Sequence, residues 1–408
     1  MPQKRNGSPA ALVLVFLTLI GFFSFMQLFC TPVMLPLISK SLNLNTAQLG
    51  LIWGMSTFGG LFFALPAGLL GDRVGSRWSI FTITIIAAIF LGMRGLAKDT
   101  ASMATMMFIG GGVVGGLSSL VTKAVFVWFP PTRVGLANGL WYSLSNIGVA
   151  VGSAVSAAVL AIALRGWQNT FFLYAAILFV LALLWLIIIR EPQNLKSSNR
   201  VPLREAFAKS TKSRDVWLCV AACFGVLGLS TEVMGYLPTY LQNIGWREAS
   251  SSLAFTVFFL SWVVGGFVLP ALSDKVRLRK IFFIFPAFIH IIAIGLLVVT
   301  TSAVQIWALI VIAGFAYGAL MPVLRLVIAE TKGIGARYAG TAISIGMGIG
   351  GGAGLLFAAV SGNLALTNAI LPFVFGPLLC LVCIIPFFFT METGTRNIKV
   401  QGEQKPVI

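Results

Sequence analysis

Charged residues are scarce in this chain. Asp, Glu, Lys and Arg make up 10% of its 408 residues, whereas an ordinary soluble domain carries roughly 25%. The apolar fraction is 58%, and a water-soluble protein of this composition would expose apolar surfaces larger than folded monomers tolerate. A soluble fold is therefore excluded, and lipid is the expected solvent.

Acidic residues, histidine and cysteine are also few. The chain has 11 Asp and Glu, one histidine (His290) and five cysteines, all of the last within apolar runs. Cys380 and Cys383 form a Cys-x-x-Cys pair, but no second pair completes the four ligands of a zinc site. No nucleophile and base set is visible either. The sequence predicts that the protein is not an enzyme and has no cofactor or metal site.

Basic residues are the common charge, with 28 Lys and Arg and a formal net charge of +17. A nucleic-acid-binding protein gathers such residues on one face, but here they occupy short polar gaps between apolar runs. We therefore expect no nucleic-acid partner, and the lipid bilayer is the expected surrounding.

Twelve apolar runs follow one another, each near the ~20 residues that a helix needs to cross a bilayer. Because the bilayer core offers no water to the backbone, such runs form helices. The predicted fold is an all-α membrane protein with twelve transmembrane helices. The expected spans are 11–38, 48–70, 78–97, 102–128, 135–164, 169–189, 215–241, 250–272, 281–301, 304–328, 338–361 and 367–391.

The basic residues are distributed unequally between alternate loops. The loops on the side of the two termini hold 21 of them, and the opposite loops hold 5. By the positive-inside rule both termini are expected in the cytosol. The first apolar run is too long for the core of a cleaved signal peptide, so it is expected to remain as the first helix.

The longest polar stretch, 191–214, divides the chain into nearly equal halves and is the expected cytosolic linker. Sliding the chain against itself by 202 residues matches several helices in one register. We therefore expect two pseudo-symmetric six-helix bundles, 1–190 and 215–408, related as parallel repeats. The matched positions are Leu35-Pro36 with Leu237-Pro238, Asp72 with Asp274, Lys123 with Arg325, Gly148 with Gly350, and Gly152 with Gly354.

The loop after the second run has the pattern Gly-x-x-x-Asp-Arg-x-Gly-x-Arg at 68–77, and a degenerate copy follows at 270–279. This pattern resembles the signature loop of the major facilitator superfamily. Motif, position, helix count and repeat agree over nearly the whole chain. The resemblance implies the major facilitator fold, a place in the cell inner membrane, and transport by alternating access.

The motif also has a direct physical interpretation. Glycine permits a tight turn, and Asp72 can bond a helix N-terminus or a basic side chain. A conformational latch on the cytosolic face is predicted; the alternative is that Arg73 and Arg77 only follow the positive-inside bias. The latch residues are Gly68, Asp72, Arg73, Gly75, Arg77, Asp274, Lys275 and Arg279.

Two further segments resemble particular branches of the superfamily. The end of the fourth run, 123–130, resembles organic-anion/proton symporters, in which a basic residue precedes Trp-Phe-Pro by five positions. The glycine-rich 344–354 resembles nitrate and nitrite porters, although the arginines of that family in helices 2 and 8 are missing. The resemblance implies a secondary active transporter of a small carboxylate-like organic anion, with protons as the coupling ion. The alternative is an exporter of cationic or apolar compounds of the drug/proton antiporter type.

Charged residues inside the expected spans each cost about 2.5 to 3.5 kcal/mol on insertion scales, and three of them stand out. Lys123 and Arg325 are equivalent in the repeat; they either attract an anionic substrate or snorkel to the cytosolic interface. Glu232 is near mid-membrane, where burial disfavours the charged carboxylate, and it is the expected proton-coupling residue. Its alternative role is that of a structural partner for a nearby donor.

Tyr236 shares a helix face with Glu232, and Tyr317 shares one with Arg325. Together with Lys123 and Arg325, the two tyrosines belong to the predicted substrate-binding set, although aromatic residues in membrane helices also serve as packing. A monomer that binds a small molecule is expected. The other members of the set are Gln27 and Asn146.

Overall fold

The computed structural model describes residues 9–129, 134–190 and 203–393, and the regular elements in these ranges are all helical. Ten described helices are long and apolar enough to cross a membrane, and α12 is a shorter apolar helix. A further run, α6, continues through a π-helical segment, η3, and α7. These correspond to the twelve predicted spans, and the all-α membrane fold is confirmed.

The helices keep close to the boundaries expected from hydropathy. Their bounds are α1 Ala10–Phe29, α2 Thr31–Leu42, α3 Thr46–Val74, α4 Ser76–Met93, η1 Arg94–Leu96, α5 Thr100–Trp128, α6 Val134–Val155, η3 Ser156–Leu160, α7 Ala161–Ala163, α8 Trp167–Ile188, α9 Leu203–Lys212, α10 Arg214–Asn243, α11 Glu248–Val276, α12 Lys280–Leu296, α13 Ala303–Glu330, α14 Gly335–Thr367, α15 Pro372–Ile384 and η4 Ile385–Phe389.

Local sequence signals set several helix ends. Asn45 caps α3 by accepting a hydrogen bond from the Gln48 backbone, and the Gln48 side chain bonds back to Asn45. This reciprocal pair satisfies two N–H groups that the first turn leaves unpaired. Gly75, between α3 and α4, has φ of 84°, a conformation that favours glycine. The tight turn predicted for the signature loop is therefore present.

The first predicted span differs from expectation because it is interrupted. Helix α1 ends at Phe29 and α2 begins at Thr31, with Pro32 in its first turn. Proline has no N–H to donate to the preceding turn, and the Thr31 hydroxyl instead donates to the Leu28 carbonyl at 2.7 Å. The span 11–38 is thus two helices joined at Cys30.

The chain forms two compact units. Unit 1 comprises Met1–Ser198, Ser230–Leu260 and Gly351–Pro372, and unit 2 comprises Asn199–Leu229, Ser261–Gly350 and Phe373–Ile408. Helices α10, α11 and α14 therefore contribute a segment to each unit.

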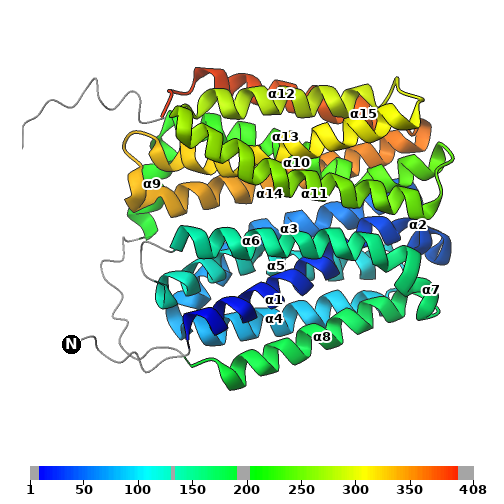
Figure 1. The fold of residues 1–408 in the computed structure, drawn as a ribbon, viewed down its shortest axis with the longest axis horizontal. Helices are drawn as coiled ribbons and strands as arrows, with labels where there is room; N and C mark the ends of the chain where they lie inside the picture. The colour runs from blue at the N-terminus through cyan, green and yellow to red at the C-terminus, as the bar shows by residue number, and fades with distance from the viewer. Residues whose placement is uncertain (1–8, 130–133, 191–202, 394–408) are drawn as a thin grey trace, which may run out of the picture. The chain divides into compact units, whose positions relative to one another are not determined.

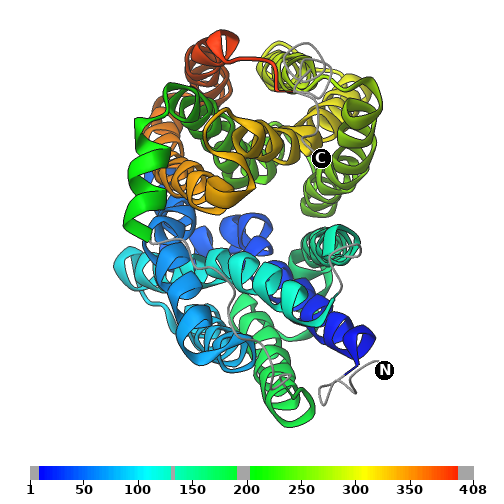
Figure 2. The ribbon, with the colours of Figure 1, turned by 90° about the vertical axis from the view of Figure 1, so that its left-hand side faces the viewer.

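Within unit 1, α3 packs on α5, α1 on α6, and α4 on both α5 and α8. These helices run alongside one another in Figure 1 and are seen nearly end-on in Figure 2. Within unit 2, α12 packs on α13. The short helix α9 lies across the direction of the unit 2 helices (Figure 2), and it occupies most of the described part of the predicted linker.

Candidate functional site

Glu232 is the most deeply placed acidic residue of the described chain. It lies in the part of α10 that belongs to unit 1, and its side chain is 0% exposed. Neither carboxyl oxygen has a hydrogen-bond partner among the described residues. The Ser361 hydroxyl of α14 lies close enough to interact with the carboxyl, but it too makes no hydrogen bond in the described part of the chain.

Two aromatic side chains form hydrogen bonds between the helices near Glu232. The Trp53 indole nitrogen of α3 donates to the Thr231 carbonyl at 2.7 Å. The Tyr236 hydroxyl of α10 lies 3.0 Å from the Thr46 carbonyl of α3 and 3.1 Å from the Ala358 carbonyl of α14. A buried hydroxyl therefore bridges three helices one turn beyond the acid.

The backbones of α3 and α14 approach closely in the same region. A Cβ on Gly50 would collide with the Tyr236 hydroxyl and the Ala358 carbonyl, and one on Gly54 would lie 2.8 Å from the Leu355 Cα. Only glycine fits such an approach. We refer to this contact of α3 with α10 and α14 as the seam; it comprises Thr46, Gly50, Trp53, Gly54, Thr231, Tyr236, Gly354, Ala358 and Gly362.

Arg325 lies in α13 of unit 2 and is half-buried. Within the described ranges its guanidinium makes one hydrogen bond, from Nη2 to the Met347 Sδ of α14 at 3.9 Å. A thioether is a weak acceptor. The Nε–H is buried and has no partner among the described residues. The guanidinium, which carries five N–H donors, is therefore far from saturated.

Lys123 lies in α5 of unit 1 and is also half-buried. It extends toward the end of α3: a Cβ placed on Gly71 would lie 4.0 Å from the Lys123 Nζ. The ammonium group therefore sits beside the helix that carries the signature loop. The choice between substrate contact and snorkelling stays a prediction for this residue.

The other predicted substrate-binding residues are engaged in packing. Tyr317 is 3% exposed, and its ring lies 4.7 Å from that of Trp262 and 5.3 Å from that of His290. Asn146 donates to the Tyr142 carbonyl of its own helix at 2.8 Å. Gln27 is fully buried and donates to the Phe171 carbonyl at 3.4 Å. Their contact with a substrate stays a prediction.

Arg94 is a buried cation that the sequence did not single out, because it lies at the outer end of the predicted span 78–97, among the basic residues of the outer side. It is 0% exposed. Its Nε donates to the Leu91 carbonyl at 2.8 Å, and Nη2 donates to the Gln27 carbonyl at 2.6 Å. Nη1 bonds the Thr31 hydroxyl, and the guanidinium carbon lies 4.2 Å from the centre of the Phe171 ring.

The partners of Arg94 explain how a charge can be buried there. Leu91 and Gln27 lie in the last turns of α4 and α1, where helix dipoles present negative charge, and the Phe171 ring face adds a cation–π contact. Arg94 thus bonds to residues on both sides of the interruption, Gln27 of α1 and Thr31 of α2. Pro32 is the sequence signal that could have indicated this role, because it marks the helix break. The carbonyl groups at such a break need a hydrogen-bond donor, and the Arg94 guanidinium is one.

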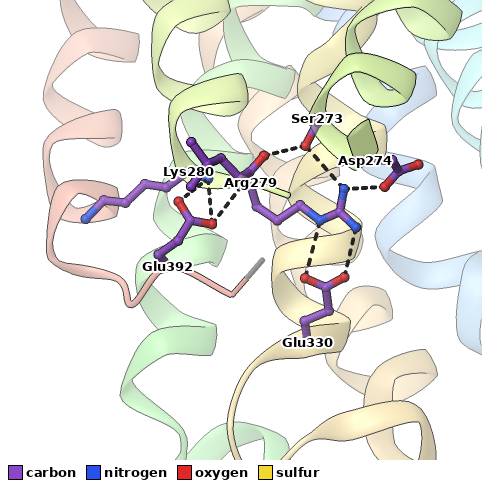
Figure 3. A network of polar contacts seen from close by, with 7 residues as sticks. Ser273, Asp274, Arg279, Lys280, Glu330 and Glu392 are labelled. Atoms are coloured by element: carbon purple, nitrogen blue, oxygen red, sulfur yellow. Dashed lines mark hydrogen bonds and ion pairs between the residues drawn. The ribbon is translucent and has the colours of Figure 1, made fainter. Parts of the chain in front are cut away.

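The second copy of the signature motif forms an ionic network (Figure 3). Arg279 pairs with Asp274 and with Glu330, the latter at 3.1 Å. The Glu392 carboxylate accepts hydrogen bonds from the Arg279 and Lys280 backbone nitrogens at the start of α12, at 2.7 and 3.0 Å. Burial acts to lower the pKa of the Arg279 guanidinium, but the bonds to Glu330 and Asp274 prevail and raise it.

The first copy makes different contacts. Arg77 donates to the Leu186 carbonyl, and Trp185 donates to the Arg77 carbonyl at 2.9 Å. Leu186 and Phe388 are related by the 202-residue repeat, and the Phe388 carbonyl accepts from Lys280 at 2.5 Å. Lys275 is exposed. The side chains of Gly68, Asp72 and Arg73 lie outside the described residues, so the latch stays a prediction for them.

Long apolar helices with a few buried charges define a polytopic membrane protein. The sequence model of the Major Facilitator Superfamily matches residues 17–345. The chain therefore belongs to the major facilitator superfamily, as the signature loop predicted.

Two curated relatives are named as transporters. The chain is 25% identical over 333 residues to the hexuronate transporter of Bacillus subtilis (strain 168), covering 76% of this chain and 78% of the relative. It is 28% identical over 256 residues to the probable nitrate transporter NarT of Staphylococcus aureus (strain MRSA252), covering 62% and 63%. The match to the nitrate transporter thus spans less than two thirds of its length.

Solved structures show the same fold. A bacterial homologue of the human lysosomal transporter Spinster superimposes with a TM-score of 0.71 at 19% identity, covering 93% of this chain and 92% of the other. The nucleoside transporter NupG superimposes with a TM-score of 0.74 at 15% identity, covering 93% and 99%. The major facilitator fold is confirmed.

Proposed function

We propose that the protein is a proton-coupled secondary transporter of a small, carboxylate-like organic anion. It works by alternating access of two six-helix bundles, 1–190 and 215–408, joined by the linker 191–214. It acts as a monomer in the cell inner membrane with both termini in the cytosol.

The unsaturated guanidinium of Arg325 is the observation that carries this proposal. Placing a cation in a membrane helix is costly, and Arg94 offsets that cost with carbonyl, hydroxyl and ring contacts. Arg325 has a single weak sulfur contact and a buried, unbonded Nε–H among the described residues. A guanidinium binds a carboxylate through two parallel hydrogen bonds. An anionic substrate therefore supplies Arg325 with strong hydrogen-bond acceptors and a compensating negative charge.

The relatives support an anion. Hexuronate, named for the Bacillus subtilis relative, and nitrate, named for the staphylococcal one, are both small anions with a planar, delocalised charge. The carboxylate class is preferred because the hexuronate transporter matches more of its own length. Lys123, the repeat equivalent of Arg325, supplies the second cation in this proposal.

Proton coupling rests on Glu232. An isolated carboxylate buried away from water carries a large desolvation cost, so such a group exchanges its charge for a proton. A carboxyl that is 0% exposed and unbonded in the described chain is suited to that exchange. In this proposal it carries the proton that moves with the anion.

The binding experiment uses purified protein in detergent with glucuronate and nitrate as probes. Arg325→Gln and Lys123→Gln are each expected to weaken glucuronate binding by about tenfold or more, which corresponds to ~1.4 kcal/mol. Lys40→Gln, at an exposed lysine, is the matched control and is expected to bind normally. Normal affinity in both test variants would overturn the anion site, and preferential binding of a cationic drug would favour the exporter.

A transport experiment tests the coupling. Uptake of glucuronate into proteoliposomes is expected to follow an imposed proton gradient in the wild type. Glu232→Gln resembles the protonated acid, so binding should persist while the response to the gradient disappears. A retained response would remove Glu232 from the coupling step.

A further inference from the structure

Helix α9 differs from the membrane-spanning helices in direction and in composition. It lies across the direction of the unit 2 helices (Figure 2). Its buried face carries Ala206 and Ser210, which are four residues apart. The other sides are exposed and hold the charged residues of the helix, Arg204, Glu205, Lys209 and Lys212. A basic amphipathic helix of this kind is typical of the surface of a bilayer.

Two hydrogen bonds fix the orientation of α9. The Tyr338 hydroxyl of α14 donates to the Glu205 carboxylate at 2.5 Å, and the Trp217 indole nitrogen of α10 donates to the Thr211 carbonyl at 2.8 Å. Successive residues of a helix are rotated by about 100°, so Glu205 and Phe207 lie on nearly opposite sides of α9. Because Glu205 faces α14, the side that carries Phe207 faces away from α14.

This side of α9 carries an arginine and an aromatic residue one turn apart, and the start of α10 repeats the arrangement. Arg204 precedes Phe207 by three residues, and Arg214 precedes Trp217 by three, a spacing that makes each pair neighbours on the helix surface. Phe207 is 56% exposed and Trp217 is 46% exposed. Both arginines are exposed, and neither forms an ion pair within the described residues. We call these four residues the arginine–aromatic face.

Trp217 indicates where this face lies in the membrane. It stands in the first turn of α10, which continues to Asn243 as a membrane-spanning helix. Its indole nitrogen is bonded to α9 while much of the ring is exposed. Tryptophan is enriched at the level of the lipid headgroups because its ring is apolar and its N–H is polar. The arginine–aromatic face is therefore expected at the boundary between lipid and water.

We propose that the arginine–aromatic face binds an anionic phospholipid of the cytosolic leaflet. The guanidinium groups of Arg204 and Arg214 bond the headgroup phosphate, and the Phe207 and Trp217 rings pack among the upper parts of the acyl chains. The lipid is anionic because the two positive charges of this face have no described carboxylate as a partner. The bound lipid holds the described part of the linker at the membrane surface.

This inference goes beyond the proposed transport activity. It uses the cytosolic orientation proposed above and is independent of the anion site at Arg325. A variant of the arginine–aromatic face should therefore bind glucuronate with wild-type affinity, so the two proposals fail separately.

The binding experiment uses purified protein in detergent with fluorescently labelled phosphatidylglycerol, and with phosphatidylcholine carrying the same label as the zwitterionic comparison. The wild type should prefer phosphatidylglycerol, and added salt should weaken the preference because exposed charges are screened. Arg204→Gln and Arg214→Gln should each weaken phosphatidylglycerol binding by about fivefold, which corresponds to ~1 kcal/mol for each basic residue near an anionic surface. The double variant should lose about 25-fold.

Three further variants make the outcome specific. Lys209→Gln is the matched control, because it removes one exposed positive charge from the side of α9 nearer to Glu205; it should bind both lipids like the wild type. Replacing Arg204 and Arg214 together by lysine keeps the charges and should retain the preference for phosphatidylglycerol. Phe207→Ala should weaken binding of both lipids and leave the preference between them.

Hydrogen–deuterium exchange locates the bound lipid. Amides of 203–213 should exchange more slowly in nanodiscs that contain phosphatidylglycerol than in nanodiscs of phosphatidylcholine alone, and the double glutamine variant should abolish the difference. Normal phosphatidylglycerol binding in that variant, or equal binding of the two lipids by the wild type, would overturn the inference. So would an equal loss in Lys209→Gln and Arg204→Gln, because it would reduce the effect to general attraction by a basic surface.

Discussion

The indole nitrogen of Trp53 donates a 2.7 Å hydrogen bond to the backbone carbonyl of Thr231, the residue directly before Glu232 in α10. The two residues are 178 positions apart in the chain, and both are buried. A hydrogen bond from a side chain to a helix carbonyl fixes the rotation of one helix against another. Trp53 therefore fixes the rotation of α10 against α3 at the residue next to Glu232.

Trp53→Phe is expected to destabilise the protein, because it removes this donor while retaining most of the aromatic volume. Hydrogen bonds between membrane helices contribute about 0.6 kcal/mol on average and up to ~1.7 kcal/mol, and the loss should fall in this range. Thermal unfolding in detergent measures it. Trp78→Phe, at a position that is 49% exposed, is the matched control; equal effects of both changes would contradict the assigned role.

Arg94→Lys is expected to be more damaging, even though it retains the charge. Lysine lacks the planar fork that reaches the Leu91 and Gln27 carbonyls together, and each buried acceptor left unpaired costs about 1 to 3 kcal/mol. Folded yield and thermal stability should fall. The comparison is Arg247→Lys, at an exposed arginine.

The same variant separates a structural role from a binding role. Protein that does fold with Arg94→Lys should bind glucuronate with wild-type affinity, because the Arg94 donors are directed to the chain itself. A specific loss of anion affinity with normal stability would assign Arg94 to the substrate path instead.

Arg279→Lys tests the latch. The guanidinium bonds Asp274 and both carboxylate oxygens of Glu330, an arrangement that a lysine ammonium cannot reproduce. Transport into proteoliposomes should slow while insertion and expression stay normal. Arg277→Lys, at an exposed position of the same loop, should transport at the wild-type rate. A normal rate in Arg279→Lys would limit the network to a structural role.

The orientation of the chain is tested with a reporter that is active only in the cytosol. Fused after Ile408, it should be active, and inserted near Glu248 it should be inactive. The reason is the excess of basic residues in the loops on the side of the termini, since positively charged loops stay in the cytosol. Activity only at the Glu248 position would reverse the assigned orientation.

Much of the fold was accessible from the sequence because the membrane leaves the backbone few choices. Hydropathy located α3, α5, α10 and α13 to within a few residues, and the loop at 68–77 identified the family. The break at Cys30 was missed since hydropathy averages over a window, although Pro32 marked it. The π-helical segment at Ser156–Leu160 was missed for the same reason.

Only part of the candidate functional site could be predicted from the sequence. Glu232 and Arg325 stand out in sequence because charges are rare in apolar runs. The sequence could not separate Arg325, whose guanidinium is unsaturated, from Arg94, whose guanidinium is bonded by helix ends. Both are single arginines near the end of a span, and their difference depends on which carbonyls of distant segments come within reach.

Sequence by itself thus determined that the protein lies in lipid, how many helices it has, the 202-residue repeat and the family. Each of these follows from local composition and spacing. Tertiary structure alone decided that α3 and α14 meet beside the segment of α10 that carries Glu232. Their contact depends on Gly50 and Gly54 meeting Ala358 and Gly354 at backbone distance, across about 300 residues of intervening chain. Such a contact arises from the packing of whole helices, which no local pattern encodes.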